Sequence, residues 1–287
     1  MRPIIGLLAK GQALLNDGGQ ASLEAYLNRV AEMCGRHGFS PAGVTISPRL
    51  LQSNGQDKDE VEALREQLND LNLRCTAGVG SLQLHAKPQL VQAALTRAIA
   101  GLEFAAALSA DAATFGPGLY GRVSRYGHIR MAVEQYGRLA DEAAKYGLRV
   151  CHENYDSFNA DEFQWIFDAC DRDNLGLLND TGNWVITHDD PLVATQRFAS
   201  RTFHVHLKDY VWNDGVWNMV PLGTGIINFP AILRELRAAP QPLITVIEMD
   251  LDDGSDEIEA QERSLAYLRT LFDEMKEARS IGGRPTP

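Results

Sequence analysis

Four residues of metal-binding type stand near the ends of four apolar runs in the second half of the chain. They are Glu153, Asp180, His206 and Glu248. Three carboxylates and one imidazole are ligands for a hard or borderline divalent ion, Mn²⁺ first, with Mg²⁺ or Co²⁺ as alternatives. No cysteine is among the four, and the lack of thiolate ligands argues against a structural zinc site.

Each of these residues alone has an ordinary structural explanation. An acid at a strand end often caps a helix or faces solvent, and a histidine in a strand is often a hydrogen-bonded core residue. Three acids that converge on one point, however, would repel one another and take up protons, whereas a divalent cation removes this penalty. The four residues together therefore predict one single-metal site.

Eight repeated strand-and-helix units must position these residues. Short apolar runs alternate with amphipathic stretches of helical period along the whole chain. The predicted strands cover 3–9, 42–47, 73–79, 112–117, 148–154, 175–180, 202–209 and 243–250. We expect an α/β fold, a single-domain (β/α)8 TIM barrel over 1–278, followed by a flexible C-terminal tail over 279–287.

In such a barrel the chemistry gathers at the C-terminal ends of the strands, where all four residues lie. Side chains alternate along a strand, so an inward Asp180 implies an inward Leu178, and an inward Glu153 implies an inward Cys151. We expect the barrel interior below the site to be apolar. An open doubly wound sheet is the competing fold, but the segment after the first strand lacks a G-x-G-x-x-G motif.

Composition narrows the possible partners and compartment. Hydrophobic residues make up 45% and charged residues 23% of the 287, as in soluble globular proteins. The net charge of −11, without a basic cluster, argues against nucleic acid. The N-terminus does not resemble a signal peptide, no run of 18 apolar residues occurs, and no C-x-x-C pair is present. We expect a cytoplasmic protein with buried free thiols that binds no membrane, and a homo-oligomer stays open.

Five segments resemble a known superfamily. They are HEN at Glu153, LLNDTGN at Asp180, HVHLKD at His206, PLGTGIINFPAIL, and VIEMD at Glu248. They are similar to the xylose isomerase-like TIM barrel superfamily of sugar isomerases and epimerases, which includes ketose 3-epimerases, hydroxypyruvate isomerase and inosose dehydratase. The resemblance spans about residues 1 to 275, and its specific motifs lie in the second half.

The resemblance implies that the four residues hold one divalent ion and that Glu153 and Glu248 act as acid and base on a small sugar or polyol. A metal that chelates a carbonyl and the neighbouring hydroxyl would stabilise an enediolate formed by proton removal. Return of the proton to the opposite face gives epimerisation, and return to the adjacent carbon gives isomerisation.

One departure keeps the substrate open. Ketose 3-epimerases usually carry a histidine three residues after the aspartate, and this chain has Asn183, which can donate a hydrogen bond but cannot carry a proton. A metal-dependent dehydratase of the inosose or 3-dehydroshikimate type uses the same proton abstraction and is the main alternative. A non-catalytic sugar-binding barrel is another, whereas the acidic charge opposes an apurinic-site endonuclease.

Further polar and aromatic residues are candidate substrate contacts. His204 and Lys208 share the face of His206, although His204 could equally be a buried core histidine and Lys208 could form a salt bridge with Asp209. Trp184 and Trp212 follow strands six and seven, where aromatic faces can pack against sugar C–H groups, and His85 follows strand three. The LGTGIIN segment is either a phosphate cradle or a simple turn.

Overall fold

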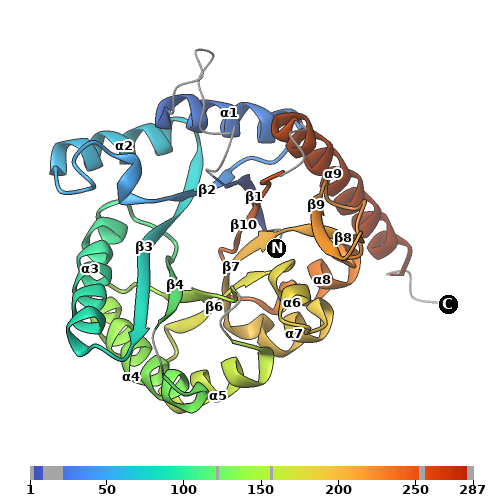
Figure 1. Cartoon of the computed structure of the whole chain (residues 1–287). Helices are drawn as coiled ribbons and strands as arrows, with labels where there is room; N and C mark the ends of the chain where they lie inside the picture. Colours follow the sequence, from blue (N-terminus) through green and yellow to red (C-terminus); the bar gives the residue numbers. More distant parts are fainter. Residues whose placement is uncertain (1–2, 9–21, 121–122, 156–157, 252–255, 283–287) are drawn as a thin grey trace.

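The computed structural model describes residues 3–8, 22–120, 123–155, 158–251 and 256–282. Eight parallel strands close into a barrel in the order β1-β10-β7-β6-β5-β4-β3-β2, and helices surround it (Figure 1). The predicted TIM barrel is therefore confirmed. The barrel strands are β1 (Ile4–Leu7), β2 (Ala42–Ile46), β3 (Leu73–His85), β4 (Ala113–Tyr120), β5 (Val150–Glu153), β6 (Leu175–Asp180), β7 (Thr202–Leu207) and β10 (Ile244–Ile247).

Local sequence signals explain where the helices begin and end. Asn228 caps the start of α8 by accepting a hydrogen bond from the Ala231 N–H, and Gly38 and Gly147 take left-handed conformations after α1 and α4, as predicted. The helices are α1 (Leu23–Arg36), α2 (Lys58–Asp70), α3 (Pro88–Ala107), α4 (Arg125–Ala144), α5 (Ala160–Cys170), α6 (Asn183–Ile186), α7 (Pro191–Phe198), α8 (Phe229–Glu235) and α9 (Glu257–Gly282), with short 3-10 turns η2 (Pro48–Leu50), η3 (Ala199–Arg201) and η4 (Leu236–Ala238).

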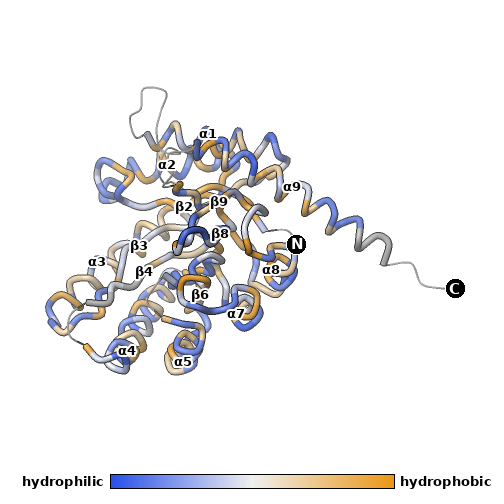
Figure 2. The backbone as a smooth tube through the Cα atoms, turned by 45° about the vertical axis from the view of Figure 1, so that its right-hand side comes forward, coloured by the Kyte–Doolittle hydropathy of each residue, from blue (hydrophilic) through white to orange (hydrophobic). Residues whose placement is uncertain are grey.

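Three features differ from the predicted boundaries. Strand β3 continues six residues beyond the predicted end at 79 and pairs with β4 as far as His85. An antiparallel hairpin of β8 (Asp209–Asn213) and β9 (Val216–Val220) follows β7. Helix α9 runs to Gly282, into the segment predicted as a tail, and extends past the barrel in Figure 2; residues 283–287 lie outside the described part of the chain.

The core lies between the barrel and its helices, and apolar side chains also fill the barrel below Glu153 and Asp180, whereas the polar His204 lies below His206. Cys151 and Leu178, each two residues before a candidate ligand, pack with Ala112 and Phe203. All four cysteines are buried and free. Among the described helices, only α3 is long and apolar enough by composition to cross a membrane, but it packs along β3 as one of the barrel's outer helices.

Candidate metal centre

The four predicted ligands meet at the C-terminal mouth of the barrel. Glu153 and Asp180 end β5 and β6, His206 is the penultimate residue of β7, and Glu248 directly follows β10. These strands are consecutive in the barrel, and one ligand atom from each residue lies within 4.8 Å of the other three. The convergence depends on parity and register, since Asp180, His206 and Val246 are level across three strands.

The His206 imidazole lies at the centre of the cluster. Its Nδ1 atom is 2.8 Å from Glu248 Oε2, 3.5 Å from Glu153 Oε1 and 3.7 Å from Asp180 Oδ2. Asp180, His206 and Glu248 are buried, whereas Glu153 keeps a quarter of its side chain exposed. Burial lowers the pKa of His206, but the three facing carboxylates outweigh it and leave the pKa well above its ordinary value.

The geometry fits a divalent cation. Among the described residues, no group forms a hydrogen bond of good geometry with either ring nitrogen of the buried His206, although three carboxylate oxygens surround Nδ1. Buried polar atoms without partners are rare in folded proteins, and a cation among them would satisfy both the imidazole and the acids. The site therefore has the oxygen-rich donor set and the local negative charge that a hard or borderline divalent ion requires.

Two residues that the sequence did not single out hold Asp180 in place. The Asn154 side chain bonds the Asp180 backbone in both directions, accepting from its N–H at 2.6 Å and donating to its carbonyl at 3.0 Å. Asp180 Oδ1 accepts from the N–H groups of Gly182 and Asn183, which leaves Oδ2 to face the cluster. The Thr181 hydroxyl donates to the carbonyl of Lys208 and ties β6 to β7.

Lys208 brings a positive charge into the same site. Its Nζ atom lies 2.8 Å from Asp180 Oδ2 and 3.1 Å from Glu248 Oε2, and the side chain is buried. Burial lowers the pKa of Lys208, but the two carboxylates raise it by more, so the amine stays protonated. Lys208 therefore pairs with candidate metal ligands and not with Asp209.

Asp209 instead organises the glycine-containing loop after the hairpin. Its carboxylate accepts from the N–H groups of Tyr210, Gly223, Gly225 and Ile227 at 2.9 to 3.0 Å. A phosphate cradle in this loop would need these same amides as donors, but they already donate to Asp209. The LGTGIIN segment is thus a turn held by Asp209.

Two predicted substrate contacts are placed away from the mouth. The prediction is wrong for Trp184, which is fully buried, stacks on Phe198 and donates its indole N–H to Asn179. His204 is also fully buried below His206, with Nδ1 2.8 Å from the Ile244 carbonyl and Nε2 3.1 Å from the Thr45 hydroxyl. It is the core histidine of our alternative interpretation, and burial lowers its pKa, so it stays neutral.

Of the other predicted contacts, Asn183 lies nearest to the cluster. It is buried, directly follows the Asp180 turn, and its side-chain amide has no hydrogen-bond partner among the described residues. Trp212 is exposed on the hairpin and packs edge-to-face on Trp217. His85 ends β3, where its Nδ1 accepts from the Lys87 N–H, and it is not among the residues that line the pocket containing Glu153.

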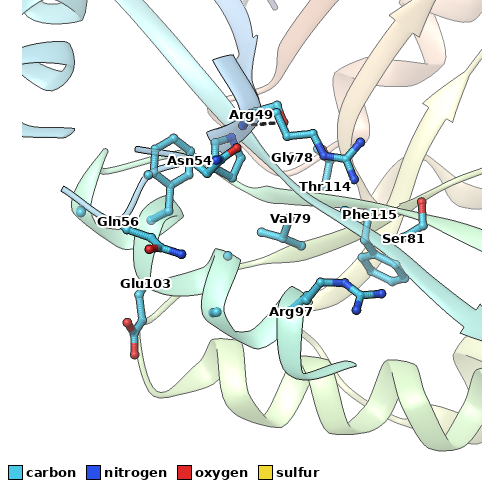
Figure 3. A pocket seen from close by; sticks show the side chains of 18 of the residues that line it. Arg49, Asn54, Gln56, Gly78, Val79, Ser81, Arg97, Glu103, Thr114 and Phe115 are labelled. Atoms are coloured by element: carbon cyan, nitrogen blue, oxygen red, sulfur yellow. Dashed lines mark hydrogen bonds between the residues drawn. The ribbon is translucent and has the colours of Figure 1, made fainter. Parts of the chain in front are cut away.

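A large pocket opens from the metal cluster toward α3. It has a volume of about 1190 Å³ and extends from Glu153 and Leu178 past the β3 backbone to the side chains of η2, α2 and α3 (Figure 3). Arg49 and Arg97 also line it, and the sequence did not point to either. The pocket wall also includes Gly80, Ser81 and Gln83, which belong to the part of β3 beyond its predicted end.

Comparison with known proteins agrees with this geometry. The family model described as "Xylose isomerase-like TIM barrel" matches residues 27–271. The chain is 25% identical over 113 residues to the 3-oxo-isoapionate decarboxylase of Pectobacterium atrosepticum, which covers 37% of this chain and 41% of that protein. It is 26% identical over 160 residues to the inosose dehydratase of Geobacillus thermodenitrificans, covering 48% of this chain and 53% of the relative.

One solved structure is similar in fold to the full length of this chain. The structure of an L-ribulose 3-epimerase superposes with a TM-score of 0.75 over 100% of both chains, at 16% identity, which supports the fold alone. The family model, by contrast, covers most of this sequence, including all four candidate ligands. With the closed barrel and the ligand cluster at its mouth, this match shows that the chain belongs to the xylose isomerase-like TIM barrel family.

Proposed function

We propose that this protein is a divalent-metal-dependent sugar isomerase or epimerase. It would move a proton at the carbon next to a carbonyl. The observation that carries the proposal is the convergence of Glu153, Asp180, His206 and Glu248 beside an open pocket. A divalent ion bound there would act as a Lewis acid and stabilise the negative charge that proton removal creates.

The two glutamates differ in a way that suits opposite roles. Glu153 is partly exposed and lines the pocket, so its carboxylate can reach a substrate proton. Glu248 is buried and lies beside His206 and Lys208, which fix its orientation. We assign the removal of the proton to Glu153 and the return of the proton to Glu248.

Asn183 and Lys208 supply the polar contacts around the reacting group. The Asn183 amide is buried and has no partner among the described residues, so it can bind a substrate oxygen without breaking an internal hydrogen bond. The Lys208 ammonium lies next to Asp180 and Glu248 and can stabilise an anionic oxygen. A barrel that only binds a sugar would need neither the Lys208 ammonium group nor the four converging ligands.

A dehydratase is the second candidate, and two observations favour it. Asn183 cannot supply the proton that a histidine at this position could, and several curated relatives with local similarity are inosose dehydratases. Such an enzyme would abstract the same proton and expel a neighbouring hydroxyl, with the Lys208 ammonium as the nearest acid.

One experiment separates these reactions. Mn²⁺-loaded protein is incubated in D₂O with a panel of ketoses and inososes. Deuterium at the carbon beside the carbonyl, read by NMR, indicates isomerisation or epimerisation, and a new absorbance from an unsaturated ketone indicates dehydration. We expect Glu153→Gln and Glu248→Gln each to lower the rate by about 10²–10⁴-fold.

Glu66→Gln, at an exposed position on α2, is the matched control and should retain the rate of the unaltered protein. Metal content measured in every variant shows whether a lost rate reflects lost metal. Full activity after complete chelation, or in both active-site glutamine variants, would refute a metal-dependent mechanism.

A further inference from the structure

The pocket is larger than the reacting part of a small sugar requires. Sites for drug-sized ligands usually measure about 300–1,000 Å³, and this one has about 1190 Å³. Only one end touches the metal cluster, through Glu153. Between that end and α3 the wall includes Gly78 and Gly80, where no side chain covers the backbone, so a substrate can extend outward from the metal.

Two arginine side chains, both exposed to solvent, line this pocket. Arg49 comes from η2, after β2, and Arg97 from the middle of α3. Among the described residues, neither guanidinium group has an ion pair or a side-chain hydrogen bond, and only the Arg49 backbone N–H is engaged, with Ser47. In Figure 3 both side chains point to the side of the pocket where Phe115 and Ser81 lie.

Among the described residues, the acids that line the pocket form no ion pair with these arginines. Glu62 is bound to Arg65 on the same helix, Glu103 accepts from the Tyr146 hydroxyl, and Glu153 faces His206. Both arginines are exposed to solvent, and neither pairs with an acid among the described residues, although the protein has a net charge of −11. Arginine binds carboxylate and phosphate groups through paired N–H donors, which gives both affinity and orientation.

We infer that the substrate carries an anionic group, a carboxylate or a phosphate ester, at the end remote from the reacting carbon, and that Arg49 and Arg97 bind this group. The inference rests on the proposed function, because it places the reacting carbon at the metal cluster. It narrows the substrate class from neutral sugars to sugar acids or sugar phosphates. The arginines then act as specificity determinants and take no part in proton transfer.

The test compares three ligands. One is neutral, and the other two carry a phosphate or a carboxylate at the end remote from the carbonyl. D-Fructose, D-fructose 6-phosphate and D-fructuronate are titrated by calorimetry into Mn²⁺-loaded protein, into Arg49→Gln/Arg97→Gln, and into Arg234→Gln. Arg234 is an exposed arginine of α8, outside the pocket and without an ion pair among the described residues. The affinities of the phosphate ligand and of the carboxylate ligand show which anion the site accepts.

We expect at least one anionic ligand to bind about tenfold or more tightly than D-fructose, and the double variant to abolish that preference. The Arg234→Gln variant should keep it. Equal binding of all three ligands would overturn the inference, and so would a preference that survives the double variant, because the metal would then be the anion site. Deuterium exchange on the same ligands reports the proposed function separately, so binding preference without exchange would refute the reaction and leave the anion site intact.

Discussion

At the scale of single residues, Asp180 shows how one carboxylate serves two purposes. Oδ1 accepts two backbone N–H groups and fixes the turn that leads into α6, while Oδ2 faces His206 and Lys208. A metal ion would therefore meet a ligand whose rotamer is already set. Such hydrogen bonds around a ligand commonly change metal affinity by about 10–100-fold, so Asn154 and Thr181 contribute to the site without touching it.

Lys208 leads to the first prediction at this scale. Lys208→Met removes a buried positive charge beside Asp180 and Glu248, so a divalent cation should bind several-fold more tightly, while turnover should fall because an anionic oxygen loses its partner. The metal-free variant should also lose about 3–5 kcal/mol of stability, since two buried carboxylates lose their counter-charge. Calorimetric Mn²⁺ titration and urea unfolding measure both effects.

The control for this change is Lys276→Met, which removes an exposed lysine paired with Asp273 on α9. It should change metal affinity and turnover little, because exposed ion pairs are weak. Weaker metal binding by Lys208→Met would contradict the prediction, since it would mean that the ammonium group supports the ligands more than it repels the cation.

At the scale of elements, the connection between β7 and α8 is the least regular part of the described mouth. It contains the β8–β9 hairpin and the turn whose amides converge on Asp209. Space is short in this turn, because a Cβ atom on Gly225 would lie 2.2 Å from Asp209 Oδ1. The aspartate and the glycine thus depend on each other, and Asp209 directly follows Lys208 in the chain.

Asp209→Asn should therefore destabilise the protein strongly. An asparagine keeps only one acceptor oxygen, and two of the four N–H groups, which are buried or partly buried, would face its amide nitrogen. Because each unsatisfied buried donor costs about 1–3 kcal/mol, we expect a loss of about 2–6 kcal/mol in urea unfolding. Asp173→Asn, at an exposed position before β6, should lie within about 0.5 kcal/mol of the unaltered protein. A comparably small effect at Asp209 would show that the loop does not need its carboxylate.

At the scale of the whole molecule, the repeated pattern was sufficient to predict the barrel, and strand parity was sufficient to bring four distant residues together. Side-chain direction beyond parity was not predictable, so Trp184 was expected at the mouth but is packed behind α7. Arg49 and Arg97 were missed for a similar reason. Both line a pocket whose wall includes the extended part of β3, and tertiary pairing with β4, more than local propensity, decides how far β3 extends.

Because one cation would join four strands, its binding should stabilise the entire barrel. A ligand that binds only the folded chain adds about 2.7 kcal/mol at a free concentration a hundredfold above its Kd, which corresponds to a rise of about 5 °C in Tm for a protein of this size. We expect Mn²⁺ to raise the Tm of chelator-treated protein in this way, measured by calorimetry. Glu248→Gln should lose most of the shift and Glu66→Gln should keep it. Equal shifts in all three proteins would mean that Mn²⁺ binds elsewhere than at the cluster that joins β5, β6, β7 and the end of β10.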